Sequence, residues 1–93
     1  MNMITLQSMI VQNEEIAAAE MDEEFVMMNI KTGNYYSLGN TGSIIWKMLS
    51  HPILVDTLIE DLIEKYQVTR QQCEEEVITF LNEMNGEGLI HIK

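Results

Sequence analysis

The pattern of apolar and polar residues changes its period near residue 39. Residues 35–38, Tyr-Tyr-Ser-Leu, alternate in the way expected of a strand with one buried face. The polar and glycine-containing segment 39–42 interrupts this alternation, and apolar residues then recur at helical spacing through residues 45–49. The sequence therefore predicts a short strand that leads directly into a helix, with strands before this junction and helices after it.

Two further strands are predicted before the junction. Residues 25–30 alternate, which places Val26, Met28 and Ile30 on one face of a strand. The alanines of residues 16–21 favour a helix on intrinsic propensity. Six residues are too few for an independent helix, however, and the polar turn that follows them favours a strand.

Two tight turns join these strands, and Gly33 supplies the positive φ that the second turn requires. Consecutive strands joined in this way form a three-stranded antiparallel meander over 16–21, 25–30 and 35–38. The third strand then lies at an edge of the sheet, where its backbone N–H and C=O groups lack a partner on one side. Residues 9–11 fit a short additional strand.

Three helices are predicted after the junction. The first spans 40–49, with Asn40 or Thr41 available to cap its N-terminus. It ends ahead of Pro52, where the second helix begins. The second helix has one apolar face, which consists of Val55, Leu58, Ile59, Leu62 and Tyr66.

The third helix is predicted to begin at Thr69 as its cap, with Gln72 as the partner in a capping box. Its apolar stripe, about 100° wide at helical spacing, consists of Cys73, Val77, Phe80, Leu81 and Met84. The extended tail 89–92 is expected to cover the core. The predicted architecture is α+β, a three-stranded antiparallel sheet followed by three helices.

The chain has 93 residues, 46% of them hydrophobic, which suits one compact domain. We expect residues 1–8 to form a flexible N-terminus and 9–93 to form the domain. No stretch approaches the roughly 18 consecutive apolar residues of a membrane span, and the first residues lack the features of a secretory signal. Cys73 has no second cysteine with which to pair. These features predict a cytoplasmic protein with no membrane partner.

Charge narrows the choice of partner. The chain carries fifteen acidic residues against five lysines and arginines, a net charge of −10. A protein that binds DNA or RNA needs cationic side chains to displace counterions from phosphates, so we expect no nucleic-acid partner. Two explanations of the charge stay open: solubility of a small domain, or attraction to a cationic partner.

No arrangement of residues predicts catalysis. His51 and His91 share no motif, and Cys73 lacks the second cysteine or nearby histidine of a metal site or an activated thiol. Gly39 and Gly42 flank a helix start without the lysine and the spacing of a phosphate loop. We therefore expect no enzymatic activity, no cofactor and no metal. The eight methionines suit either a core or a surface that accepts varied apolar side chains.

At the strand-to-helix junction the sequence resembles the PqqD family, whose members are recognition elements for ribosomally synthesised and post-translationally modified peptides. The residues that carry the resemblance are Gly33, Tyr35, Tyr36, Leu38, Gly42, Ile45 and Trp46. The acidic second helix, the third helix and Gly88 follow in the same order, so that the resemblance covers residues 16–92. One departure is Gly39, because the family usually has asparagine directly after the leucine. The chain is most similar to the stand-alone proteins of lasso-peptide pathways.

The resemblance implies a fold similar to a winged helix-turn-helix and a non-catalytic role, in which the leader of a precursor peptide is held as a fourth strand. The strand that receives the leader would consist of Tyr35, Tyr36, Ser37 and Leu38. The groove beside it would be lined by Val77, Phe80, Leu81 and Met84, with Met28 and Ile30 beneath. Of the helix residues, Phe80 and Met84 are predicted to touch the peptide, while the other two anchor the helix in the core.

The resemblance also implies partners: the precursor's leader peptide, a separate leader peptidase and a cyclase. Two alternatives stay open. A PqqD-like peptide chaperone could serve another modifying enzyme, such as a radical SAM maturase. A winged-helix nucleic-acid binder would share the fold, although Arg70 is the only cation in the third helix.

Overall fold

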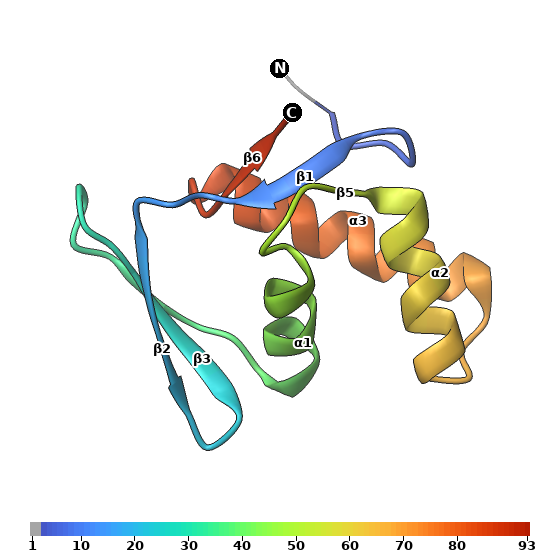
Figure 1. The fold of residues 1–93 in the computed structure, drawn as a ribbon, viewed down its shortest axis with the longest axis horizontal. Helices are drawn as coiled ribbons and strands as arrows, with labels where there is room; N and C mark the ends of the chain where they lie inside the picture. Colours follow the sequence, from blue (N-terminus) through green and yellow to red (C-terminus); the bar gives the residue numbers. More distant parts are fainter. Residues whose placement is uncertain (1–2) are drawn as a thin grey trace.

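A computed structural model describes residues 3–93 and shows an α+β fold, with helices packed beside two small sheets (Figure 1). The elements in chain order are β1 (Met9–Gln12), β2 (Ile16–Met21), β3 (Glu24–Asn29), β4 (Tyr35–Ser37), α1 (Asn40–Met48), β5 (Ile53–Leu54), α2 (Val55–Lys65), α3 (Arg70–Gly86) and β6 (Ile90–Ile92). The predicted fold class is confirmed. Among the described residues, no helix is long and apolar enough to cross a membrane.

The first sheet is the predicted antiparallel meander, in the order β2-β3-β4. Its first turn places Asp22 and Glu23 at positive φ (53° and 68°), and its second turn places Gly33 at 76°. Two consecutive residues at positive φ match the right-handed twist of the strands that they join. The strand β4 lies at the edge of this sheet, as predicted.

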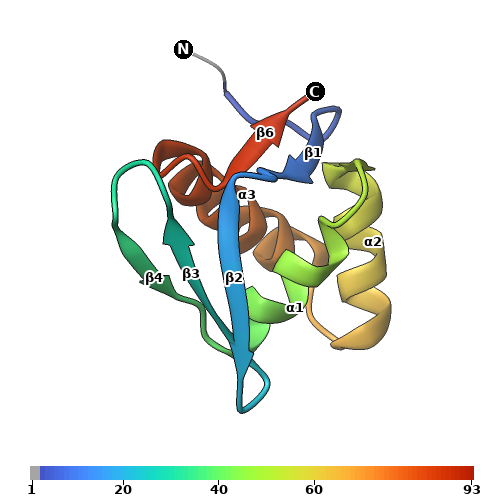
Figure 2. The same cartoon turned by 60° about the vertical axis from the view of Figure 1, so that its left-hand side comes forward.

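The second sheet, in the order β5-β1-β6, is absent from the sequence prediction as a sheet. The predicted strand at 9–11 forms its centre, and the C-terminal tail pairs with that strand as β6. Residues 53–54 pair with β1 from the other side, so α2 begins at Val55 instead of Pro52. This sheet joins segments that lie far apart in the sequence, and it covers one end of the helices (Figures 1 and 2).

The described N-terminal residues, 3–8, pack on the domain. Ile4 is only 3% exposed. The backbone N–H of Val55 donates to the Ser8 carbonyl at 2.9 Å, and the Asp56 N–H donates to the Leu6 carbonyl at 3.0 Å. The expected flexible segment 1–8 therefore contributes a core residue and fixes the start of α2, while residues 1–2 lie outside the described part.

The helix starts differ in how they are capped. Thr69 caps α3 as predicted, because its Oγ1 accepts from the Gln72 N–H at 3.3 Å. The Gln72 side chain donates to Glu76 and accepts no bond from the Thr69 N–H, so the reciprocal half of the predicted capping box is wrong. For α1 the predicted caps are wrong, because the N-cap residue is Gly39, which has no capping side chain. Helix α1 is held instead by a serine in its first turn, described below.

One core lies between the first sheet and the helices and extends under the second sheet. From β3, Met27 is fully buried in this core and Phe25 packs against it. The sequence alternation singled out the other face, that of Val26 and Met28, and this expectation is wrong, because residues 25–28 are apolar on both faces of the strand and alternation cannot identify the buried one. Val26 and Met28 point to the opposite face, and Ile30 lies beyond the end of β3.

Candidate functional site

The edge strand β4 is joined to β3 by hydrogen bonds that fix which backbone groups stay free. The Leu38 N–H donates to the Phe25 carbonyl at 2.9 Å, at one end of the pair. At the other end, the Asn29 N–H donates to the Asn34 carbonyl at 3.0 Å. In an antiparallel ladder, hydrogen-bonded and non-hydrogen-bonded pairs alternate along the strands.

This alternation determines, for each residue of β4, whether its backbone groups face β3 or the open edge. Tyr36 lies opposite Met27, midway between the two bonds, and forms a hydrogen-bonded pair with it. Tyr35 and Ser37 are non-hydrogen-bonded positions, so their N–H and C=O groups point away from β3. The free edge of β4 therefore offers two donors and two acceptors to an incoming strand.

A groove of about 530 Å³ runs along this edge, between β4 and the C-terminal half of α3. Residues 35–39 form one wall. The other wall and the far end consist of Phe80, Glu83, Met84, Glu87 and Leu89. The groove thus combines free backbone groups on one side with apolar side chains on the other, which is the arrangement that binds an extended peptide.

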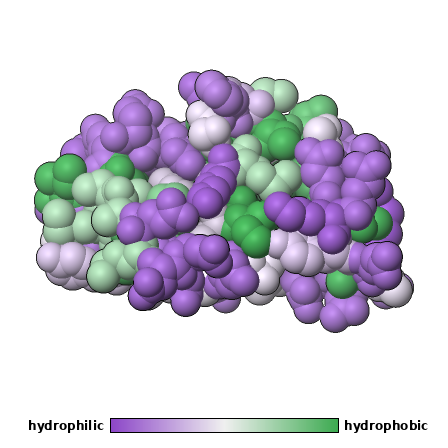
Figure 3. Space-filling view, turned by 60° about the horizontal axis from the view of Figure 1, so that its bottom comes forward, coloured by the Kyte–Doolittle hydropathy of each residue, from purple (hydrophilic) through white to green (hydrophobic). Residues whose placement is uncertain are grey.

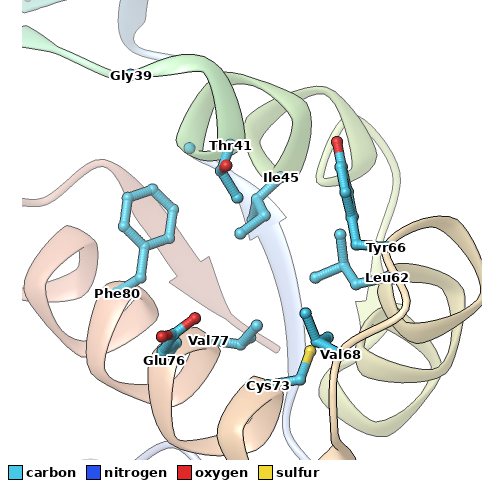
Figure 4. Close-up of a pocket in the computed structure, with 11 residues that line it drawn as sticks. Gly39, Thr41, Ile45, Leu62, Tyr66, Val68, Cys73, Glu76, Val77 and Phe80 are labelled. Atoms are coloured by element: carbon cyan, nitrogen blue, oxygen red, sulfur yellow. The ribbon is translucent and has the colours of Figure 1, made fainter.

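Phe80 lies between this groove and a second pocket of about 400 Å³ (Figure 4). The second pocket is bounded by α1, the end of α2 and the first half of α3, and Ile45, Tyr66 and Val77 point into it. A methyl group on Gly42 would come within 3.1 Å of the Phe80 ring. Gly42 therefore permits the ring to pack directly against the start of α1.

Ser43 connects the strands to α1 and was missed by sequence reasoning. Its side chain is buried, accepts from the Phe25 N–H at 2.8 Å and donates to the Leu38 carbonyl at 3.2 Å. The Ser43 N–H also donates to the Gly39 carbonyl at 2.8 Å. These bonds fix the point at which β4 becomes α1, and so they position the groove wall.

A hydrogen bond crosses one end of the groove. The Tyr36 hydroxyl donates to Glu87 Oε2 at 2.5 Å and links β4 to the end of α3. This bond, with a smaller contribution from desolvation, raises the pKa of the Tyr36 hydroxyl above its usual value. The phenol is therefore neutral at physiological pH and acts as a donor.

The predicted site residues separate into groups. Tyr35, Tyr36, Ser37 and Leu38 line the groove, as do Phe80 and Met84. Leu38 and Met84 are only 8% and 2% exposed, however, and both belong to the core, so Met84 joins the anchoring residues of α3 and only Phe80 is as open as predicted. Leu81 is fully buried in the core, and Val77 faces the second pocket. Met28 and Ile30 do not lie beneath the groove: Met28 points to the opposite face of the sheet, and Ile30 is 65% exposed. Contact of any of these residues with a peptide stays a prediction.

Cys73 lines the second pocket and not the groove. Burial, and then the neighbouring Glu76 carboxylate, raises the pKa of the Cys73 thiol, which keeps it protonated. Within residues 3–93, no group of three or more histidine, cysteine, aspartate or glutamate side chains is placed to hold a metal ion. The charged groups that line the groove are Glu83 and Glu87.

Comparisons with known proteins agree with this geometry. The model of the family described as "Coenzyme PQQ synthesis protein D (PqqD)" matches residues 24–90. The structure of TbiB1 in complex with the TbiA(beta) leader peptide is 25% identical, with a TM-score of 0.81 over 87% of this chain and 94% of that chain. A lasso peptide synthetase B1 complexed with the leader peptide is 21% identical and shares the fold, with a TM-score of 0.72 over 88% and 96%. No curated protein sequence matches the chain.

Proposed function

The chain belongs to the PqqD family, and on this basis we propose that it is a non-catalytic adaptor that binds the leader segment of a ribosomally made precursor peptide. The similar TbiB1 structure, which holds a leader peptide, supports this assignment. The observation in this chain that carries the proposal is the free edge of β4 beside the groove.

In the proposed complex, the leader adds to the sheet as a fourth strand. Its backbone bonds to the outward N–H and C=O groups of Tyr35 and Ser37. Because side chains alternate along a strand, every second leader residue enters the groove, where it meets Phe80 and Met84. Backbone bonds supply affinity without regard to sequence, and the groove supplies selectivity.

The adaptor then presents the held precursor to separate enzymes. We assign these as a leader peptidase and a cyclase of a lasso-peptide pathway, acting in the cytoplasm where the precursor is made. The description of the matching family names coenzyme synthesis, which favours a second candidate: the same groove serving a different modifying enzyme, such as a radical SAM maturase. The enzyme encoded next to the precursor gene distinguishes the two.

The test is a titration of the protein with the leader peptide of the adjacent precursor gene and, separately, with duplex DNA. We expect leader binding in the micromolar range or tighter and no sequence-specific DNA binding, because the net charge of −10 repels phosphates. Tight DNA binding without leader binding would overturn the proposal.

Two proline variants locate the binding edge. Ser37→Pro removes an outward N–H and should weaken leader binding by about fivefold or more while the fold is retained, since one backbone hydrogen bond contributes about 1 kcal/mol. Tyr36→Pro removes an N–H that faces β3 and should lower the melting temperature instead. Equal leader affinity in the wild type and in a folded Ser37→Pro variant would exclude strand addition at β4.

A further inference from the structure

The β2-β3-β4 sheet has a second face that the proposed function does not use. Cross-strand partners share a face, and the register places Ala17, Met28 and Tyr35 in one row across the three strands. The neighbouring row contains Ala19, Val26 and the polar Ser37. We call the apolar surface formed by these rows and the end of β2 the outer face: Ala17, Ala19, Met21, Val26, Met28 and Tyr35.

The outer face lies open. Figure 2 shows that the helices pack behind the sheet, on the side of Met27, and Figure 3 shows hydrophobic residues gathered at the end of the molecule that this sheet forms. Tyr35 is 72% exposed and Met21 is 62% exposed. A shallow hollow of about 230 Å³ lies between β2 and Tyr35. The face is apolar at its centre and carries one charged residue, Glu24, opposite Met21 at its end. An open apolar surface of this kind is typical of a surface that binds another protein.

The outer face is continuous with the leader-binding edge. Tyr35 borders both the groove and the hollow of the outer face. A strand added to β4 would extend the sheet, and those of its side chains that do not enter the groove would extend the outer face. A protein docked on the outer face would therefore stand next to the bound leader.

The charges around the outer face indicate the chemistry of the partner. The turn between β2 and β3 carries Asp22, Glu23 and Glu24, all exposed and without a salt bridge to any described residue. Lys31, at the other end of the hairpin, is paired with Glu15 at 3.1 Å. A second copy of this chain, with a net charge of −10, would bring like charges together. A partner that is apolar at its centre and cationic at its rim is complementary.

We propose that the outer face docks the enzyme that processes the peptide held at β4, through an apolar patch on that enzyme surrounded by lysine and arginine. This inference rests on the proposed function for the identity of the partner. It assigns separate surfaces of one small sheet to the peptide and to the enzyme, which places the substrate beside the active site that acts on it.

The test measures two affinities for each variant: that for the leader, and that for the purified leader peptidase encoded with the precursor. Ala17→Lys and Ala19→Lys place a cation at exposed positions of the outer face, on β2, which does not line the groove. We expect each to weaken peptidase binding by about tenfold or more and to leave leader affinity within about twofold of the wild type, since both positions lie outside the groove. Thr57→Lys, at an exposed position on α2, adds the same charge elsewhere and should change neither affinity.

The charge of the rim is tested by Glu23→Lys, which should weaken peptidase binding and reduce its dependence on salt. The inference would be overturned if Ala17→Lys and Ala19→Lys both bind the peptidase as tightly as the wild type does. It would also be overturned if the wild type does not bind the peptidase. A dimer in sedimentation velocity that Ala17→Lys dissociates would also overturn it, because the occupant would be a second copy. The wild type could also bind the peptidase but not the leader, while the variants lose peptidase binding. That result would support the docking face and refute the leader-binding proposal.

Discussion

The two sheets of this domain have three strands each, and they differ in what surrounds them. The sheet β5-β1-β6 joins three segments from the start, middle and end of the chain, and its central residue Ile10 is completely buried. The sheet β2-β3-β4 consists of consecutive strands joined by tight turns, and only its inner face is covered. The sheet β5-β1-β6 closes the core, whereas the sheet β2-β3-β4 presents a free edge and an open face.

This difference separates stability from binding. Long-range pairing in β5-β1-β6 joins β6 to β1, where the Lys93 N–H donates to the Met9 carbonyl at 2.7 Å, and the segment before β1 is bonded to the start of α2. The meander needs only local turns and one buried row around Met27. Substitutions at its edge and on its outer face should therefore cost little stability. The predictions below test this separation.

The largest effect is expected from Ile10→Ala. Truncating this fully buried side chain should lower the free energy of unfolding by about 2–5 kcal/mol, measured by urea denaturation. Met28→Ala, at a half-buried position on the outer face, is the comparison in the other sheet. It should lower the free energy of unfolding by less than about half as much. Equal losses in the two variants would show that the meander carries as much of the stability as the other sheet.

An effect of the same order on stability, with a smaller one on binding, is expected from two neighbours on α3. Leu81→Ala removes a fully buried side chain and should cost about 2–5 kcal/mol of stability. Phe80→Ala removes a groove residue and should weaken leader binding by about fivefold or more, or about 1 kcal/mol. The melting temperature reports stability, and the fluorescence anisotropy of a labelled leader peptide reports binding. Measuring both for each variant separates the two roles. The reverse pattern would place the peptide on the other side of α3.

The smallest effect concerns the hydrogen bond from Tyr36 to Glu87. Because the folded protein raises the pKa of the Tyr36 hydroxyl above its usual 10.0, the phenol's contribution to stability is fully present below pH 10. It is lost as the pH rises through the raised folded pKa. The wild type should therefore melt above Tyr36→Phe at pH 8, and the difference should shrink at pH 11. A difference that does not change with pH would show that this proton contributes nothing.

The local elements could be predicted because their signals lie close together in the sequence. Gly33 indicates a turn that needs positive φ, and the polar segment 39–42 interrupts the alternation typical of a strand. Thr69 followed by Gln72 indicates the start of a helix. The edge position of β4 follows from the order of the hairpins. The junction residues that resemble the PqqD family also identify the family correctly.

The remaining features depend on contacts between distant segments. The strands β5 and β6 are two and three residues long, and only pairing with β1 makes them strands. Met27 and Met28 are chemically identical, so periodicity could not decide which of them is buried. Ser43 resembles any polar residue in a first helical turn until the structure brings Phe25 and Leu38 beside it.

Hydrogen exchange at single amides tests the leader-binding account most directly. In the free protein, the amides of Tyr35 and Ser37 point to the open edge and should exchange rapidly, while the Tyr36 amide, bonded to β3, should exchange slowly. At saturating leader peptide, the account predicts that the Tyr35 and Ser37 amides slow by about tenfold or more and that Tyr36 changes little. Unchanged exchange at Tyr35 and Ser37 in a protein saturated with leader would contradict it.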